Sequence, residues 1–201
     1  MKGRKALTTI VGVGFMSALV FVGSMISIPI PTVLDVSRIH LGNIFCLLAG
    51  FMLGGLKGGL AAGLGSMLYD FTNPKYIASA PITFVNKFMM AFVCGCIAGG
   101  ILRSYASAAK TDEKGKRTAR LFIAAAAGAL TYVALYLSKG FIEDVFFLRT
   151  EVATALIDVQ VKAVTSLFNA VIATVASVPL AVALKSGLRR AGLSRWLGAE
   201  R

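Results

Sequence analysis

The chain has 201 residues, of which 57% are hydrophobic and only 15% are charged, and its mean hydropathy is +0.78. A water-soluble domain carries about 25% charged residues, so the composition excludes an ordinary soluble globular domain and indicates a protein surrounded by lipid. The net charge of +12 does not indicate nucleic-acid binding, because the basic residues form short clusters between long uncharged stretches.

The first apolar segment, residues 6–28, has no charged residue and follows a basic start. It is too long for the apolar part of a signal peptide and lacks a clear cleavage site. At about 1.5 Å per residue it is long enough to span a bilayer as a helix. We expect it to end before Pro29 and Pro31, because proline cannot continue a helix, and to lead into a polar connection over residues 32–40.

Five further apolar segments follow. The second and third are short, and a tight turn over residues 54–59 joins them. We expect a flexible hydrophilic loop over residues 103–120 and an interfacial segment over residues 139–151, which mixes aromatic and charged residues. The sequence therefore predicts an all-α integral membrane protein, a compact bundle of six transmembrane helices forming one membrane domain over residues 1–201. The predicted spans are residues 6–28, 41–56, 58–69, 81–102, 121–137 and 152–184.

The distribution of lysine and arginine predicts the orientation. With the N-terminus in the cytoplasm, 15 of the 21 basic residues fall on the cytoplasmic side, four fall outside and two, Lys87 and Lys162, fall within spans. Such an excess of positive charge marks the cytoplasmic side of a bacterial membrane protein. We therefore expect a multi-pass protein of the bacterial cytoplasmic membrane with both termini in the cytoplasm.

Polar residues inside the apolar segments are the best candidates for a functional site, because a charge at mid-bilayer costs about 2.5–3.5 kcal/mol unless it faces a partner or a cavity. Asp158, Lys162 and Asn169 recur at a spacing that puts them on one face of the last helix. Asp158 and Lys162 could form an ion pair that only neutralises itself, or this face could line a polar pocket. Polar residues from other segments fall at the same, outer side of the membrane: Asn43, Asp70, Asn86 and Lys87.

Several catalytic and metal-binding patterns are absent from the sequence. It has a single histidine, its three cysteines lack the spacing of a metal site, and it contains no phosphate-binding loop of the G-x-x-x-x-G-K-[ST] type. We therefore expect no enzyme activity, no cofactor and no metal. Many small residues lie on helix faces, where they could serve internal packing or docking to another membrane subunit: Gly14, Ala18, Gly42, Gly50, Gly54, Gly58 and Gly65.

Three stretches together resemble the substrate-binding S components of energy-coupling factor (ECF) transporters. They are HLGNIFCLLAGFMLGG at residues 40–55, GGLAAGLGSMLYD at 58–70 and APITFVNK at 80–87. The likeness covers most of residues 6–102 and is closest to the riboflavin-type subgroup that includes proposed hydroxymethylpyrimidine and pyridoxine transporters. The family's A-x-x-x-A docking motif on the first helix corresponds here to Gly14 through Ala18, with glycine at the first position.

This resemblance implies a six-helix subunit that captures a vitamin or vitamin precursor with high affinity. It would dock through Gly14 and Ala18 on a transmembrane T component driven by two cytoplasmic ATPases, with residues 29–40 as an external gate. The expected substrate-binding residues are Asn43, Tyr69, Asp70, Phe84, Asn86, Lys87, Lys162 and Asn169. The alternative is a self-sufficient proton-coupled carrier of small solutes, in which Asp70 or Asp158 titrates. A third possibility is a membrane scaffold that transports nothing.

Overall fold

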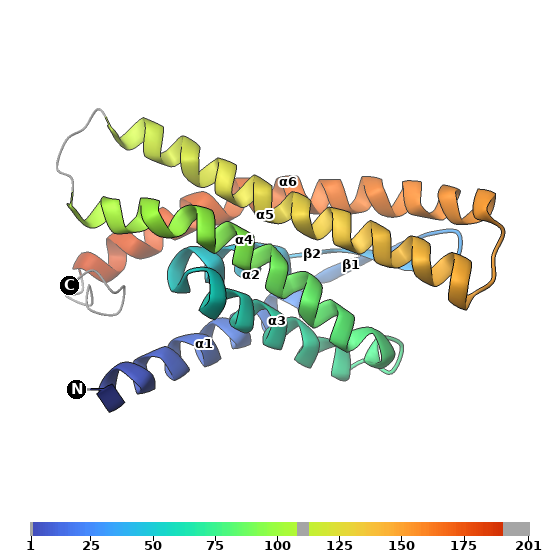
Figure 1. Ribbon diagram of the computed structural model, residues 1–201, viewed down its shortest axis with the longest axis horizontal. Helices are drawn as coiled ribbons and strands as arrows, with labels where there is room; N and C mark the ends of the chain where they lie inside the picture. Colours follow the sequence, from blue (N-terminus) through green and yellow to red (C-terminus); the bar gives the residue numbers. More distant parts are fainter. Residues whose placement is uncertain (1, 108–112, 191–201) are drawn as a thin grey trace.

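A computed structural model describes residues 2–107 and 113–190, and Figure 1 shows its helices and its β-hairpin. Residues 108–112 of the predicted loop and 191–201 of the basic tail lie outside the described part. The helices are α1 (Lys2–Met25), α2 (Gly42–Leu53), α3 (Gly55–Phe71), α4 (Ala80–Ser107), α5 (Glu113–Ile142) and α6 (Val152–Arg190). The shorter elements are β1 (Ser27–Pro31), β2 (Val36–His40), a 3-10 turn η1 (Ile77–Ser79) and a π-helical turn η2 (Glu143–Phe147).

Four of the described helical stretches are long and apolar enough to cross a membrane: Ala6–Met25, Ile77–Ala98, Thr118–Phe147 and Val152–Gly187. The described chain thus has the predicted six helices, but α2, with 12 residues, and α3, with 17, are shorter than a usual span. Large apolar side chains are exposed along the bundle, such as Ile10 at 68% and Val164 at 71%. A lipid environment would cover such side chains, and six complete crossings remain a prediction.

The polar connection is a β-hairpin, which the sequence did not predict. Helix α1 ends at Met25, so the predicted end at residue 28 is wrong, and Ser27 already pairs with His40 in an antiparallel ladder that runs to Pro31 and Val36. Proline is tolerated in β1 because this is an edge strand whose proline positions need not donate to a second neighbour. The helix thus ends four residues before Pro29, and both prolines lie within the strand.

Helices α2 and α3 are separated by one residue, Gly54. Its φ of +82° lies in the left-handed region, which glycine adopts without the steric cost of a Cβ atom. The predicted turn over residues 54–59 is therefore wrong in extent, because α3 starts at Gly55 and the remaining glycines are helical.

Those helical glycines accept a row of phenylalanine rings from α4. Phe84, Phe88 and Phe92 stack with ring centroids 6.1 and 5.7 Å apart. Their side chains contact the positions where Cβ atoms of Gly63, Gly59 and Gly55 would stand. Gly42, Gly50, Gly58 and Gly65 likewise face neighbouring segments of the same chain. For these positions internal packing explains the small residues.

Alanine at Gly58 is expected to destabilise the protein by about 1–3 kcal/mol. A Cβ atom there would stand 2.6 Å from the Ala49 carbonyl oxygen and 2.7 Å from the Gly50 Cα atom, and neither backbone atom can move alone. Gly14→Ala is the control, because a Cβ atom at Gly14 meets nothing within 4 Å and alanine favours a helix by about 1 kcal/mol. In detergent, the midpoint of thermal unfolding should be lower for Gly58→Ala than for wild type, and for Gly14→Ala it should equal or exceed the wild-type value. The reverse order would contradict this packing.

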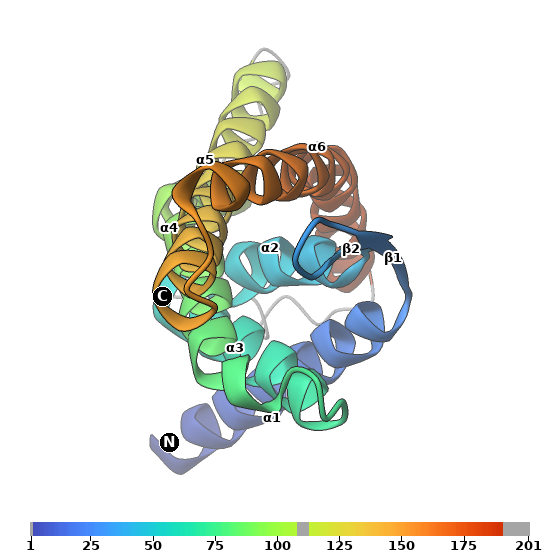
Figure 2. The ribbon, with the colours of Figure 1, turned by 90° about the vertical axis from the view of Figure 1, so that its right-hand side faces the viewer.

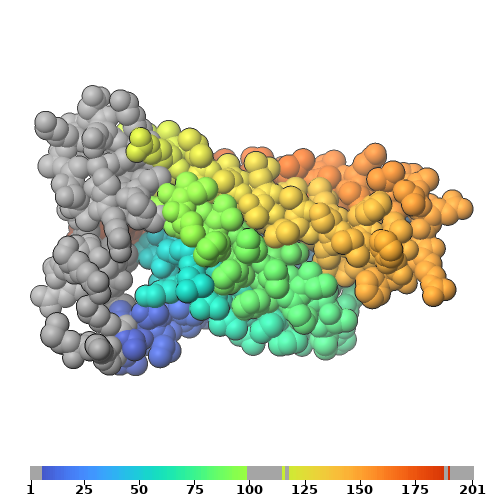
Figure 3. All heavy atoms as spheres, viewed as in Figure 1, coloured from blue at the N-terminus to red at the C-terminus, as the bar shows by residue number. Residues whose placement is uncertain are grey.

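The bundle has two different ends. The first turn of α1 and the described end of α6 lie at one end, whereas the hairpin and the turns η1 and η2 lie at the other (Figures 1 and 2). Side chains of α3, α4 and α5 form a continuous surface on the face that Figure 3 shows. The buried core includes Leu47 and Leu48 of α2, Met90 of α4 and Leu121 of α5. Helix α2 is thus the central element, and the hairpin immediately precedes it in the chain.

Candidate functional site

A cavity of about 780 Å³ opens at the hairpin end of the bundle. Residues of β2, η1 and the helices α3, α4, α5 and α6 line it. Most of its polar lining lies on segments that the sequence places far apart. The cavity is therefore a product of the tertiary fold, and β2 with the hairpin turn forms part of its wall.

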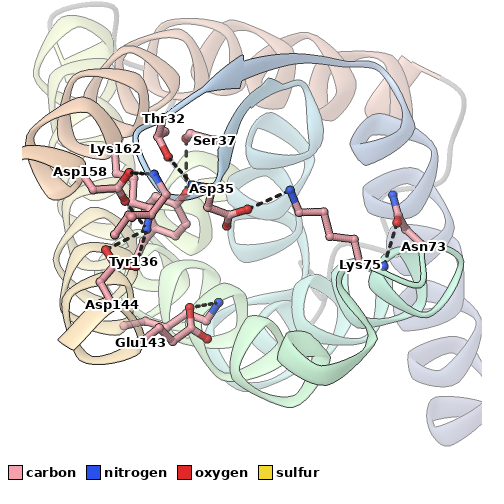
Figure 4. Close-up of polar contacts among 12 residues, drawn as sticks. Thr32, Asp35, Ser37, Asn73, Lys75, Tyr136, Glu143, Asp144, Asp158 and Lys162 are labelled. Atoms are coloured by element: carbon pink, nitrogen blue, oxygen red, sulfur yellow. Dashed lines mark hydrogen bonds and ion pairs between the residues drawn. The ribbon is translucent and has the colours of Figure 1, made fainter. Parts of the chain in front are cut away.

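One side of the cavity is built by α6. Lys162 Nζ lies 2.6 Å from Asp158 Oδ2 on the same helix and 3.2 Å from Asp144 Oδ2 in η2 (Figure 4). All three side chains are at most 5% exposed. The two readings of the sequence are therefore not exclusive: Asp158 and Lys162 form an ion pair, and Lys162 also lines the cavity together with Asp144.

The sequence analysis missed Asp144, which lies in the segment expected at the membrane interface. Helix α5 instead runs to Ile142 and continues into the π-helical turn, so Asp144 is buried. A signal was available, because Tyr132, Tyr136, Gly140 and Asp144 recur every four residues. That spacing puts them on one helix face. Three of them line the cavity, and a Cβ atom at Gly140 would contact Lys162.

The same face of α6 holds the hairpin. Asp158 Oδ1 accepts a hydrogen bond of 2.9 Å from the Leu34 backbone N–H. Asn169 accepts one of 3.1 Å from the His40 N–H and donates one of 2.6 Å to the Arg38 carbonyl oxygen. These bonds satisfy backbone groups in the hairpin turn and on β2. Asn169 therefore acts both as a lining residue and as a clamp on β2.

Arg38 of β2 lies among aromatic rings. Its guanidinium carbon is 4.1 Å from the ring centroid of Tyr76 and 4.9 Å from that of Tyr69, and its Nη2 is 3.7 Å from Asp70 Oδ1. Arg38 and Tyr76 were not among the expected site residues. Asp70 is 3% exposed and lines the cavity together with Tyr69.

Lys87 and Asn86 of α4 form the floor. Lys87 Nζ donates a hydrogen bond to Asn43 Oδ1 and stands 3.6 Å from the ring centroid of Tyr132. Both Lys87 and Asn86 line the cavity, whereas Asn43 does not and reaches it only through Lys87. A buried asparagine on α2 thus supports a lysine on α4.

The eight expected binding residues therefore divide into three groups. Six line the cavity, and Asn43 stands behind one of them. Phe84 is not part of the lining, because its ring stacks on Phe88 in the row that packs against α3. Phe84, expected to bind the substrate, thus packs inside the bundle, whereas the rings of Tyr132 and Tyr136, stacked at 5.7 Å, line the cavity.

His40, in β2, is expected to make stability depend on pH. Burial lowers its pKa well below the usual 6.5, and the positive charges of Lys87 and Arg38 lower it further. Because the pKa of His40 is lower in the folded than in the unfolded protein, the unfolded protein takes up a proton first as the pH falls below 6.5. The free energy of unfolding therefore keeps its full value above pH 6.5 and decreases as the pH falls toward the folded-state pKa, by up to about 1.4 kcal/mol per pH unit. Thermal unfolding between pH 7.5 and 5 should show a smaller decline for His40→Gln than for wild type. Parallel declines would contradict a buried neutral histidine.

Two further ion pairs line the cavity, one exposed and one half-buried. Lys75 is 2.9 Å from Asp35 in the hairpin turn, and Lys139 is 3.0 Å from Glu143, as Figure 4 shows for the first pair. Among the described residues no group of three or more His, Cys, Asp or Glu side chains could hold a metal ion. The site thus offers charges, amides and aromatic rings, which are suited to binding a small polar molecule without covalent chemistry.

A comparison with protein families gives one match. The model of the family described as ECF-type riboflavin transporter, S component, matches residues 4–186. No curated protein and no solved structure matches the chain significantly.

Proposed function

The chain belongs to the ECF-type riboflavin transporter S component family, and on this premise we propose that it captures a small water-soluble vitamin or vitamin precursor with high affinity. Members of the family are multi-pass membrane subunits that bind a small-molecule substrate and are not enzymes. For this chain we propose a substrate of the hydroxymethylpyrimidine, pyridoxine or riboflavin class.

The observation that carries the proposal is the polar and aromatic cavity at the hairpin end. Its lining combines tyrosine rings with amide, ammonium and carboxylate groups, which is the chemistry that orients a flat heterocycle with ring nitrogens and hydroxyl groups. The β-hairpin lies over it and is held by side chains of α6. Release of the hairpin would open the cavity, so we propose that residues 29–40 form the gate.

The proposal includes an orientation and partners. ECF S components associate with T and ATPase components, and we propose that this chain docks on a transmembrane T component energised by two cytoplasmic ATPases. The described ends of α1 and α6, which lie opposite the cavity, carry basic residues. The positive-inside rule then puts that end in the cytoplasm and the cavity toward the outside of a bacterial cytoplasmic membrane.

Uptake of labelled pyridoxine, hydroxymethylpyrimidine and riboflavin tests this function. Cells that express the chain together with the T component and both ATPases should accumulate one of these compounds, and cells lacking the ATPases should not. Accumulation without the ATPases that an uncoupler abolishes would support the proton-coupled carrier instead.

A further inference from the structure

The charges that line the cavity do not balance residue by residue. Its lining contains five lysine or arginine side chains, and four of them have a carboxylate within 4 Å. These pairs are Arg38 with Asp70, Lys75 with Asp35, Lys139 with Glu143, and Lys162 with both Asp144 and Asp158. Among the side chains that the structure describes, Lys87 alone of these five has no carboxylate partner.

Lys87 is also almost completely buried. The residue is 3% exposed, and the polar and ring partners that the described residues give its Nζ are the neutral Asn43 amide and the face of the Tyr132 ring. Asn43 is 1% exposed and its own Nδ2 has no hydrogen-bond partner within the described chain. A buried ammonium without a counter-charge is unfavourable. A negatively charged group of a bound substrate next to Lys87 would therefore be stabilised by this ammonium.

The groups beside Lys87 favour an aromatic substrate over a simple anion. Asn86, the preceding residue, is 6% exposed, lines the cavity and has no hydrogen-bond partner among the described residues. The stacked rings of Tyr132 and Tyr136 line the same cavity, and the Tyr132 ring contacts Lys87. One ammonium, one amide and a tyrosine face thus converge from α4 and α5.

We propose that Lys87 binds an anionic oxygen carried by the ring of the substrate, while Asn86 hydrogen-bonds the adjacent ring edge. The inference rests on the proposed function and narrows it to planar heterocycles with an ionisable ring hydroxyl. Pyridoxine has such a hydroxyl group. An aminopyrimidine without an acidic oxygen does not.

Titration calorimetry with the purified chain in detergent tests the inference with four probes. They are pyridoxine, its ring-hydroxyl methyl ether, 4-amino-5-hydroxymethyl-2-methylpyrimidine and riboflavin. Wild type should bind pyridoxine at least 10-fold more tightly than the ether, which cannot ionise. Because a hydrogen bond to a charged group contributes more than a neutral one, Lys87→Gln should weaken pyridoxine binding about 10- to 100-fold and should weaken ether binding by a clearly smaller factor.

Lys57→Gln is the control for the loss of a lysine, since Lys57 lies outside the cavity lining and donates to Thr9 on α1. It should bind pyridoxine as wild type does. Equal affinities of wild type for pyridoxine and its ether would overturn the inference without any variant, and so would an unchanged affinity of Lys87→Gln. Tight binding of the aminopyrimidine or riboflavin, but not of pyridoxine, would overturn the role of Lys87 and leave the proposed function standing. A folded wild type that binds none of the four would overturn both.

Discussion

Replacing Lys162 by methionine is expected to destabilise the folded protein by about 3–5 kcal/mol, because removing one partner of a buried ion pair leaves an uncompensated charge. Here two carboxylates would remain. Asp144 and Asp158 are 2% and 0% exposed, and both lie within 3.2 Å of the ammonium. A large fall in the midpoint of thermal unfolding in detergent, or the loss of folded protein, is therefore the expected result.

A rescue and a control make this prediction specific. The triple variant Lys162→Met, Asp144→Asn, Asp158→Asn has no charge left in the cluster and should recover most of the stability, since the amide introduced by Asp158→Asn would still offer an oxygen to the Leu34 N–H. Lys75→Met removes a lysine from an ion pair whose side chains are 51% and 43% exposed, so it should cost less than about 1 kcal/mol. Equal effects of Lys75→Met and Lys162→Met would show that the buried cluster has no special role.

Tryptophan at Ala18 is expected to abolish uptake and leave substrate binding unchanged. Gly14 and Ala18 lie one turn apart on the exposed face of α1, and a Cβ atom at Gly14 would contact nothing within 4 Å. Unlike the glycines of α3, this pair therefore serves no internal packing. Small residues on an exposed membrane helix allow close approach of another helix, which a tryptophan side chain would prevent.

The assay compares uptake by the assembled transporter with binding by the isolated chain. Ala134→Trp is the matched control, because Ala134 is exposed on α5, far along the sequence from α1 and outside the cavity lining. It should preserve both uptake and binding. Undiminished uptake by Ala18→Trp would contradict docking through this face of α1, and weakened binding would show that Ala18 affects the substrate site.

Helices were predictable from the sequence where hydrophobic runs were long. The periodicity of α6 also put Asp158, Lys162 and Asn169 on one face, and their contacts agree with that placement. The hairpin was not predictable in this way, because residues 27 and 28 continue an apolar run and the prolines at 29 and 31 indicate only that the helix ends. Only pairing with residues 36–40 distinguishes a β-strand from an irregular connection, and this pairing depends on the tertiary structure.

The candidate site was harder to predict because its parts depend on contacts between elements. Polar residues inside apolar runs were a good signal, and they found Lys87, Asn86 and Lys162. The same rule missed Arg38 and Asp144, which lie in polar stretches where a charge is unremarkable until the fold buries it. Phe84 was suggested on a different ground, as an aromatic residue near polar neighbours, and the sequence does not reveal which way such a ring points.

Identification of the small molecule that copurifies with the chain is the most direct test of the account. The protein, expressed with its native membrane partners and purified in mild detergent, would be denatured and the released compounds analysed by mass spectrometry. The account predicts one flat, vitamin-like heterocycle per chain, which the purified protein binds again after removal. Folded protein that releases no such compound, and binds none when offered the vitamins named above, would contradict it.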